Sequence, residues 1–321
     1  MIYQRILACL LAGLLMPGGL FTFAASADGG EGKKLLVIAT AFPAYDFARA
    51  VAGDCAEVTM LLAPGVESHS YEPTPQSIIK IRGCDLFLYV GGVADVWVER
   101  VLDSMEEEAL RSVALTDCVD MLEEEIVEGM QEEHEEEEHG DGGDVSVYDE
   151  HVWTSPRNAQ KIVLQLAEVF AETDPEGADT YRNNAADYVQ KLSLLDAAFQ
   201  DVVNNAARKT LVFGDRFPFR YLVADYGLNY YAAFPGCSTE TEPSVQTVAF
   251  LIDKVREEGI PVVFHIELAN EKMADAICDA TGARKLLLHA CHNIAKSDFD
   301  QGVTYVDLMT RNVSALKEAL W

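Results

Sequence analysis

The sequence predicts an α/β protein of two lobes, each with a parallel sheet flanked by helices, joined by one long rigid helix. Short, unbroken apolar runs alternate with amphipathic segments in both halves, as in parallel sheets covered by helices. Between the halves, residues 174–207 keep apolar side chains at helical spacing. At 1.5 Å per residue, such a helix of about 30 residues spans about 45 Å, which exceeds the length of an ordinary crossover.

Residues 1–27 have the features of a secretory signal peptide. Arg5 gives a positive start, residues 6–20 are largely apolar, and Ala25-Ser26-Ala27 offers a small-residue cleavage site. The apolar run is short and interrupted, which argues against a transmembrane anchor. Cys9 as a lipid-attachment residue lies too early in this run to be favoured. We therefore expect an exported protein, in the periplasm or at the cell surface.

The composition limits the classes of partner. The formal net charge is −29, so the surface repels nucleic acid and anionic membranes and attracts cations. Six of the seven cysteines lie beyond the signal peptide, and an even number in an oxidising compartment permits disulfides. We expect Cys55 to pair with Cys84, and two of the three late cysteines to pair with each other: Cys237, Cys278 and Cys291.

The N-terminal lobe is expected over residues 34–173, with strands at 35–39, 58–62 and 86–90. Its most informative stretch is 64–76, which follows the second strand. Thr74 is a suitable N-cap and Pro75 a suitable first helical residue. His69 therefore lies in a proline-stiffened loop between a strand and a helix, a setting that suits a metal ligand or an acid–base group as well as an ordinary surface histidine.

A second histidine occupies an equivalent setting. His151 precedes a helix that Thr154 or Ser155 can cap and that Pro156 can begin. Between the two histidines, residues 123–144 form a glutamate-rich run with His134 and His139, followed by glycines. Such a run cannot bury a core, so we expect a mobile, solvated loop that either captures cations or only aids solubility.

The C-terminal lobe is expected over residues 208–321. Asp215, Glu267 and His289 each follow a predicted strand (211–213, 262–266 and 286–288), where open α/β sheets bind ligands. His265 lies inside a strand and is expected to be structural, whereas His292 could be a ligand or a surface residue. Imidazoles with one carboxylate form typical four-coordinate zinc sites, and nitrogen-rich sites favour zinc over manganese.

Two motifs carry a resemblance. The run 64–74, PGVESHSYEPT, resembles the first ligand motif of the zinc/manganese-type substrate-binding proteins of ABC importers, and 149–156, DEHVWTSP, resembles their second. The resemblance covers nearly all of the exported chain. It implies two α/β lobes holding a metal ion between them, no enzymatic activity, and handover of the ion to a membrane permease powered by an ATPase. We also expect a monomer.

The sequence departs from the family pattern at two ligand positions. Arg216 stands at the third ligand position, so Asp215 beside it would have to serve, and His289 stands where the fourth ligand is usually Asp. The expected metal ligands are therefore His69, His151, Asp215 and His289. A site with Glu267, His292 or water in place of Asp215 stays open.

The resulting expectation is a zinc-binding protein that delivers Zn²⁺ to an ABC permease, with Mn²⁺ as the other candidate metal. A manganese-binding homologue and a metal-dependent adhesin or sensor are the alternatives. A secreted metallohydrolase is less favoured, because the sequence contains neither H-E-x-x-H nor G-x-S-x-G.

Overall fold

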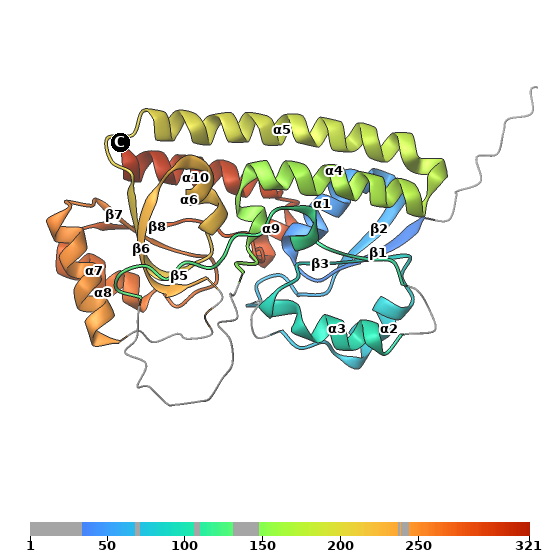
Figure 1. Ribbon diagram of the computed structural model, residues 1–321, viewed down its shortest axis with the longest axis horizontal. Helices are drawn as coiled ribbons and strands as arrows, with labels where there is room; N and C mark the ends of the chain where they lie inside the picture. Colours follow the sequence, from blue (N-terminus) through green and yellow to red (C-terminus); the bar gives the residue numbers. More distant parts are fainter. Residues whose placement is uncertain (1–33, 68–70, 106–109, 131–147, 237, 239–243) are drawn as a thin grey trace, which may run out of the picture. The chain divides into compact units, whose positions relative to one another are not determined.

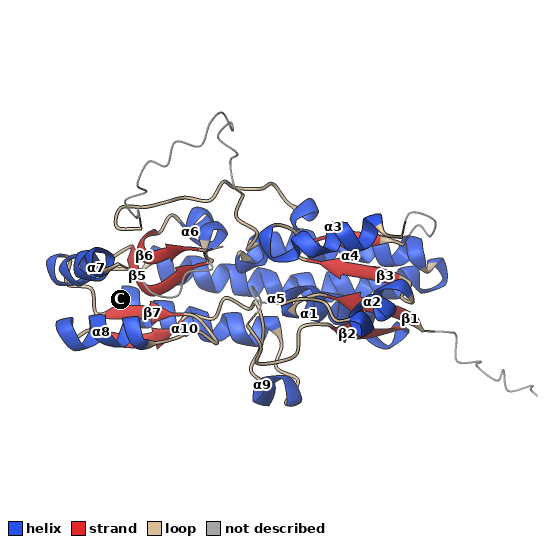
Figure 2. Ribbon diagram, turned by 90° about the horizontal axis from the view of Figure 1, so that it is seen from below, coloured by secondary structure: helices blue, strands red, loops and turns tan. Residues whose placement is uncertain are grey.

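Two four-stranded parallel sheets form the framework of the computed structural model, which describes residues 34–67, 71–105, 110–130, 148–236, 238 and 244–321. The N-terminal sheet has the order β2-β1-β3-β4, with β1 Leu35–Ala39, β2 Ala56–Met60, β3 Leu86–Tyr89 and β4 Ser112–Ala114. The C-terminal sheet has the order β6-β5-β7-β8, with β5 Thr210–Phe217, β6 Asn229–Pro235, β7 Val262–His265 and β8 Arg284–Leu287. Figure 2 shows the two sheets next to each other.

Helices cover both faces of each sheet (Figure 1). In the N-terminal half, α2 and α3 lie on the opposite side of the sheet from α4 (Figure 1). The helices of this half are α1 Phe42–Ala52, α2 Pro75–Arg82, α3 Val96–Asp103 and α4 Pro156–Thr173. Those of the C-terminal half are α6 Arg220–Tyr226, α7 Val245–Glu257, α8 Lys272–Thr281, α9 Lys296–Asp300 and α10 Tyr305–Leu320. The predicted fold class is confirmed.

The long helix α5, Ala178–Asn204, runs across both sheets (Figure 1). Its 27 residues span about 40 Å at 1.5 Å per residue. A single turn of 3-10 helix, Pro175–Gly177, precedes it, so the regular helix begins a few residues after the predicted start. It buries one apolar stripe against α1, α4 and α10, which includes Tyr181, Tyr188, Leu192 and Phe199.

The buried carboxylate of Asp46 links helices of the two halves next to α5. Asp46 of α1 accepts hydrogen bonds from Tyr188 Oη of α5 (3.0 Å), from the N–H of Tyr305 of α10 (3.0 Å) and from Arg49 (2.7 Å). The main hydrophobic cluster is also continuous between the halves, because it contains residues of both β1 and β5. The two lobes therefore share one core.

The two helices that follow the histidine motifs begin where the sequence predicts. Thr74 Oγ1 accepts a hydrogen bond from the N–H of Ser77 (3.1 Å), and Pro75 is the first residue of α2. Ser155 Oγ accepts from the N–H groups of Arg157 and Asn158, so Ser155 is the N-cap of α4. The Thr154 hydroxyl instead donates to the carbonyl oxygen of His151 (2.8 Å), which fixes the turn that carries this histidine.

The predicted Cys55–Cys84 disulfide is wrong. Both residues are free thiols, as are Cys118, Cys278 and Cys291, while Cys237 lies outside the described residues. Any pair among the three late cysteines would include Cys278 or Cys291, so the second predicted disulfide is wrong as well. Cys55 directly precedes β2 and Cys84 lies just before β3, and β1 runs between these two strands. Strands two places apart are separated by about 10 Å, which is beyond the Cα separation of about 7 Å that a disulfide can bridge.

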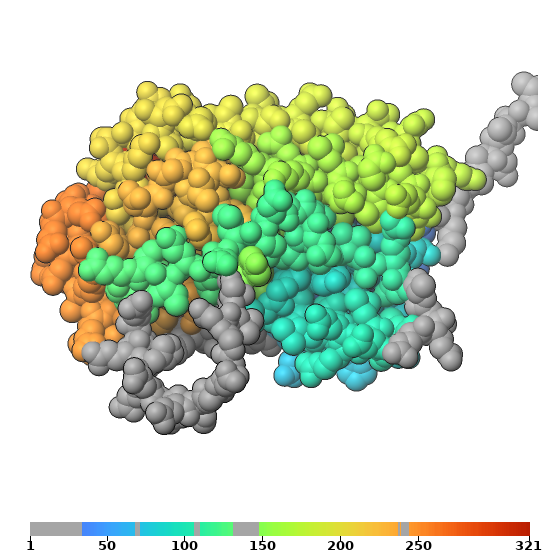
Figure 3. Space-filling view, viewed as in Figure 1, coloured from blue at the N-terminus to red at the C-terminus, as the bar shows by residue number. Residues whose placement is uncertain are grey.

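The predicted signal peptide, residues 1–27, and most of the acidic run lie outside the described residues. The first part of the acidic run, residues 123–130, is described and lies along the C-terminal half (Figure 3). Glu125 pairs with Arg220, Glu128 pairs with Lys254, and Gly129 abuts the ring of Phe250. In the described part of the chain, no helix has both the length and the apolar character needed to cross a bilayer.

Candidate metal centre

His151 is fully buried and held by the aspartate two residues before it. Asp149 Oδ1 accepts hydrogen bonds from the backbone N–H of His151 (2.8 Å) and from its ring Nδ1 (2.9 Å). Burial lowers the pKa of His151, but the charge and hydrogen bond of Asp149 outweigh it, so the pKa is raised. A carboxylate on Nδ1 fixes the tautomer whose Nε2 carries the lone pair, which is the usual arrangement of a metal-bound histidine.

His292 lies beside His151. Their ring centroids are 4.6 Å apart with an interplanar angle of 78°, and Trp153 packs edge-on against both rings. The indole N–H of Trp153 donates to the carbonyl oxygen of Ala290 (2.7 Å). This bond fixes the Trp153 ring to the chain two residues before His292. Burial and the neighbouring His151 lower the pKa of His292. A neutral imidazole is the form that binds a metal ion.

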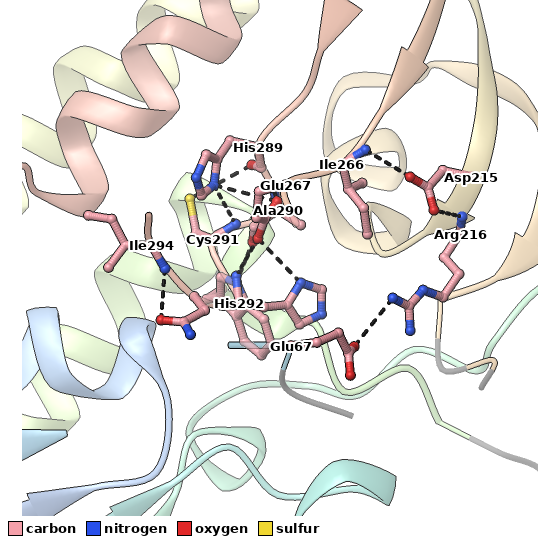
Figure 4. A network of polar contacts seen from close by, with 12 residues as sticks. Glu67, Asp215, Arg216, Ile266, Glu267, His289, Ala290, Cys291, His292 and Ile294 are labelled. Carbon is pink, nitrogen blue, oxygen red and sulfur yellow. Dashed lines mark hydrogen bonds and ion pairs between the residues drawn. The ribbon is translucent and has the colours of Figure 1, made fainter. Parts of the chain in front are cut away.

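Glu267, two residues after the end of β7, holds the backbone and ring of His292 (Figure 4). Its Oε1 accepts from the N–H of His292 (2.9 Å) and lies 3.7 Å from Nδ1 of the ring, while Oε2 accepts from the N–H of Ala290 (2.7 Å). Burial by itself raises the pKa of Glu267, but the imidazoles of His289 and His292 and the N–H of Ala290 lower it to about 2. Glu267 is therefore an anion at neutral pH.

His289 lies on the other side of Glu267 from His292 (Figure 4). Its Nδ1 accepts a hydrogen bond from the N–H of Cys291 (3.0 Å) and is 3.6 Å from Glu267 Oε2. Its backbone N–H and carbonyl oxygen are both bound by the side chain of Asn312 of α10. The structure thus brings His292, rather than His289, to His151.

The Asp215 carboxylate binds backbone amides near the C-terminal ends of β5 and β7. Its Oδ1 accepts from the N–H of Arg216 (2.8 Å) and its Oδ2 from the N–H of Ile266 (3.2 Å), so both oxygens bind backbone amides. Burial raises the pKa of Asp215. Arg216, the next residue, donates to the carbonyl oxygen of Ser238 (3.2 Å) and to Glu67 Oε1 (3.3 Å) of the N-terminal half.

Unusual backbone conformations flank this cluster. Among the described residues, the non-glycine residues with positive φ are Leu268 (60°), directly after Glu267, and Cys291 (62°), directly before His292. A left-handed conformation costs about 1–2 kcal/mol for a residue with a Cβ. Such outliers persist where the surroundings impose them, often at functional sites. Here they set the turns that bring the Glu267 carboxylate to the amides of Ala290 and His292.

His292 borders two hollows. One, of about 260 Å³ including space open to solvent, is lined by Glu67, Arg216, Glu267 and His292. The other, of about 390 Å³ on the same basis, is lined by Asp95, Glu150, Trp153 and His292. Within the described ranges, no group of three or more His, Cys, Asp or Glu side chains is arranged to hold a metal ion. His69 lies outside these ranges and stays a predicted ligand.

Comparison with known proteins decides the family. Residues 37–319 match the family model of ZnuA, described as zinc-uptake complex component A, periplasmic. The chain belongs to this family. The resemblance expected from the two histidine motifs is therefore confirmed. The family is that of a zinc-transport component rather than of an enzyme.

Two curated relatives cover most of the chain. The zinc-binding lipoprotein AdcA of Streptococcus pneumoniae is 32% identical over 299 residues, which are 93% of this chain and 58% of the relative. The chain thus spans little more than half the length of that relative. The high-affinity zinc uptake system protein ZnuA of Bacillus subtilis is 33% identical over 295 residues, covering 92% of this chain and 90% of the relative.

A solved structure agrees with the fold. The Zn(II)-bound ZnuA-like domain of S. pneumoniae AdcA superposes with a TM-score of 0.73 at 30% identity, covering 89% of this chain and 99% of that domain.

Sequence reasoning left two of these site residues undecided and missed others. It named Glu267 and His292 as open alternatives, and their nearness is set by the turn at Cys291. It missed Asp149 as the partner of His151, although the spacing Asp-x-His is the signal for such a turn. It also gave no role to Glu67, two residues before His69.

Proposed function

We propose that this chain is the exported zinc-binding component of an ABC importer. It binds one Zn²⁺ ion and hands it to a membrane permease, acts as a monomer, and has no enzymatic activity. The observation that carries the proposal is the pair His151 and His292. These two rings, from opposite halves of the chain, are in contact, and the Nδ1 side of each is held by a buried carboxylate.

The proposed ligands are Nε2 of His151 and of His292, together with the predicted ligand His69. Asp149 and Glu267 act as the carboxylates that orient the two rings, which typically contribute 10–100-fold to metal affinity. Asp215 and His289 rank below them as ligands. The Asp215 oxygens bind backbone amides, and Nδ1 of His289 accepts from the N–H of Cys291.

Zinc rather than manganese is the proposed cargo because imidazole nitrogen favours zinc, whereas manganese prefers oxygen ligands. Relatives of this chain carry zinc in their names, including zinc-binding lipoprotein AdcA and the zinc uptake protein ZnuA. Competition between the two ions tests this choice. We expect manganese to displace bound zinc only at a large excess.

The deciding experiment compares His151→Ala, His292→Ala and His289→Ala in the purified chain. Zinc affinity is measured by competition with a chromophoric chelator. The first two variants should lose about 100-fold or more, equivalent to about 2.8 kcal/mol, and His289→Ala clearly less. His265→Ala is the control, because this ring lies on β7 and contacts the carbonyl oxygen of Ile266. Full affinity in His292→Ala with loss in His289→Ala would move the site to His289.

A further inference from the structure

The smaller of the two hollows beside His292 has one wall that belongs to the N-terminal half. Val66 and Glu67, from the loop at residues 63–67 that follows β2, line this hollow together with His292. We propose that Asn293 is a positioning residue that holds this loop beside His292 and thereby slows the release of bound zinc. This inference rests on the proposed zinc site and adds a residue that controls it.

The side-chain amide of Asn293 is bound through both its nitrogen and its oxygen. Its Nδ2 donates to the carbonyl oxygens of Ala63 (2.8 Å) and Val66 (2.7 Å), while its Oδ1 accepts from the N–H of Ile294 (2.8 Å). The N–H of Gly65 also donates to the carbonyl oxygen of Ile294 (2.8 Å). Three hydrogen bonds therefore join the 63–67 loop to the segment that follows β8.

The chain around Asn293 is fixed independently of these bonds. Glu267 accepts from the N–H groups of Ala290 (2.7 Å) and His292 (2.9 Å). The carbonyl oxygen of His292 accepts from the N–H of Phe42 (3.3 Å), at the start of α1. Asn293 itself is only 1% exposed. It is therefore a buried, fixed donor to which the loop is attached.

The loop, by contrast, lies at the surface, where Ala63, Gly65 and Val66 are exposed. Without the Asn293 amide, the carbonyl oxygens of Ala63 and Val66 lose their donor, and an unpaired carbonyl is costly unless water reaches it. Because the loop is exposed, it can move outward to meet water while the buried chain at Asn293 stays in place. This movement opens one wall of the hollow and gives water and chelators access to the zinc ion.

A second contact holds the same loop from the C-terminal half, and it is weaker. Arg216 Nη2 lies 3.3 Å from Glu67 Oε1 (Figure 4). The Glu67 side chain is 33% exposed, and solvent screening leaves such an ion pair a small contribution. The Asn293 bonds are shorter and their donor is buried. Asn293 therefore holds the loop more firmly than Arg216 does.

The first test follows the loop in the zinc-free chain with Asn293→Ala, Asn293→Asp and Arg216→Met. Aspartate preserves the side-chain volume and the acceptor for Ile294 but cannot donate to the loop, so it decides the question if the alanine variant folds poorly. Hydrogen exchange of the Gly65 N–H reports directly on the attachment. Exchange should be about 10-fold faster in both Asn293 variants, as for loss of two hydrogen bonds, and should change less in Arg216→Met.

The second test measures zinc release from the loaded chain by rapid mixing with excess chelator. Groups just outside the ligands typically contribute 10–100-fold to metal affinity. Asn293 binds no proposed donor atom, so we expect the lower end, about 10-fold faster release in both Asn293 variants. Asn184→Ala is the matched control, because its Nδ2 donates to the carbonyl oxygen of Val51 (2.9 Å) between α5 and α1, and neither residue lines the hollow. It should change neither readout.

Two outcomes would overturn the inference alone while the wild type binds zinc tightly. One is normal Gly65 exchange and normal zinc release in both Asn293 variants, because the loop would then be held by other contacts. The other is faster Gly65 exchange with unchanged zinc release, because the loop would then not control the ion. Absence of tight zinc binding in the wild type is a different result, and it would refute the proposed function together with this inference.

Discussion

Replacing Asp149 with asparagine isolates the effect of one carboxylate on one proposed ligand. Asp149 accepts from both the backbone N–H and the ring Nδ1 of His151, and both side chains are almost completely buried. Asparagine preserves the side-chain volume and one acceptor oxygen but removes the charge. The imidazole then loses basicity and its fixed tautomer.

The expected size of the effect follows from the position of Asp149 next to the proposed ligand. Loss of a carboxylate that orients a metal-binding histidine typically costs 10–100-fold in metal affinity, which is about 1.4–2.8 kcal/mol. The effect should depend on pH. Because Asp149 raises the pKa of His151, protons compete with zinc in the wild type, and in Asp149→Asn burial lowers this pKa and weakens the competition. The deficit should therefore be largest near pH 8 and shrink toward about pH 6.

The assay is zinc competition with a chelator of known affinity across that pH range. Asp174→Asn is the matched control, since Asp174 accepts a hydrogen bond from Tyr181 Oη (2.7 Å) at the α4–α5 corner. It should leave zinc affinity unchanged. An unchanged affinity in Asp149→Asn, or a deficit of equal size at every pH, would refute the orienting role.

Three further substitutions test the fold around the site. Burial raises the pKa of Asp95 to about 6, above its unfolded value of 3.8, so the zinc-free fold gains stability as pH falls through about 6; between pH 8 and about 5 this gain is about 1.4 kcal/mol, and Asp95→Asn should remove it in thermal melts across that range. Glycine adopts a positive φ without a Cβ clash, so Cys291→Gly should keep the turn and leave zinc affinity unchanged, whereas Cys291→Val should disfavour the turn and weaken zinc binding; equal zinc affinity in the two variants would show that the Cys291 turn has no role in the site. Asp46→Asn should lower the melting temperature through loss of charge-assisted bonds worth about 2 kcal/mol, with zinc affinity unaffected, and an unchanged melt would contradict the proposed tie between the halves.

The fold was largely predictable because buried parallel strands consist of consecutive apolar residues. Leu86–Tyr89 and Val262–His265 are such runs, and both were expected within one residue of their ends. Two strands were missed for physical reasons. Ser112–Ala114 is only three residues long, and Asn229–Pro235 mixes tyrosine, alanine and proline without a period that the sequence alone identifies as a strand.

The site was less predictable, because ligand choice depends on backbone turns that residue types do not reveal. His289 and His292 follow the same strand three residues apart, and their residue types rank them equally. The structure separates them through the positive φ of Cys291, a conformation more often adopted by glycine or asparagine than by cysteine. That turn directs both the N–H and the ring of His292 to Glu267 and leaves His289 to the side chain of Asn312.

Positions 215 and 216 also show why the ligands could not be chosen from the sequence alone. A missing ligand in a sequence motif suggests that a neighbouring residue takes its place, and Asp215 is the nearest carboxylate along the chain. In the folded chain, however, the Asp215 oxygens bind the amides of Arg216 and Ile266, while the guanidinium of Arg216 meets Glu67 from the other lobe. Strand geometry turns adjacent side chains to opposite faces. The residue beside a lost ligand on a strand is therefore a poor candidate to replace it.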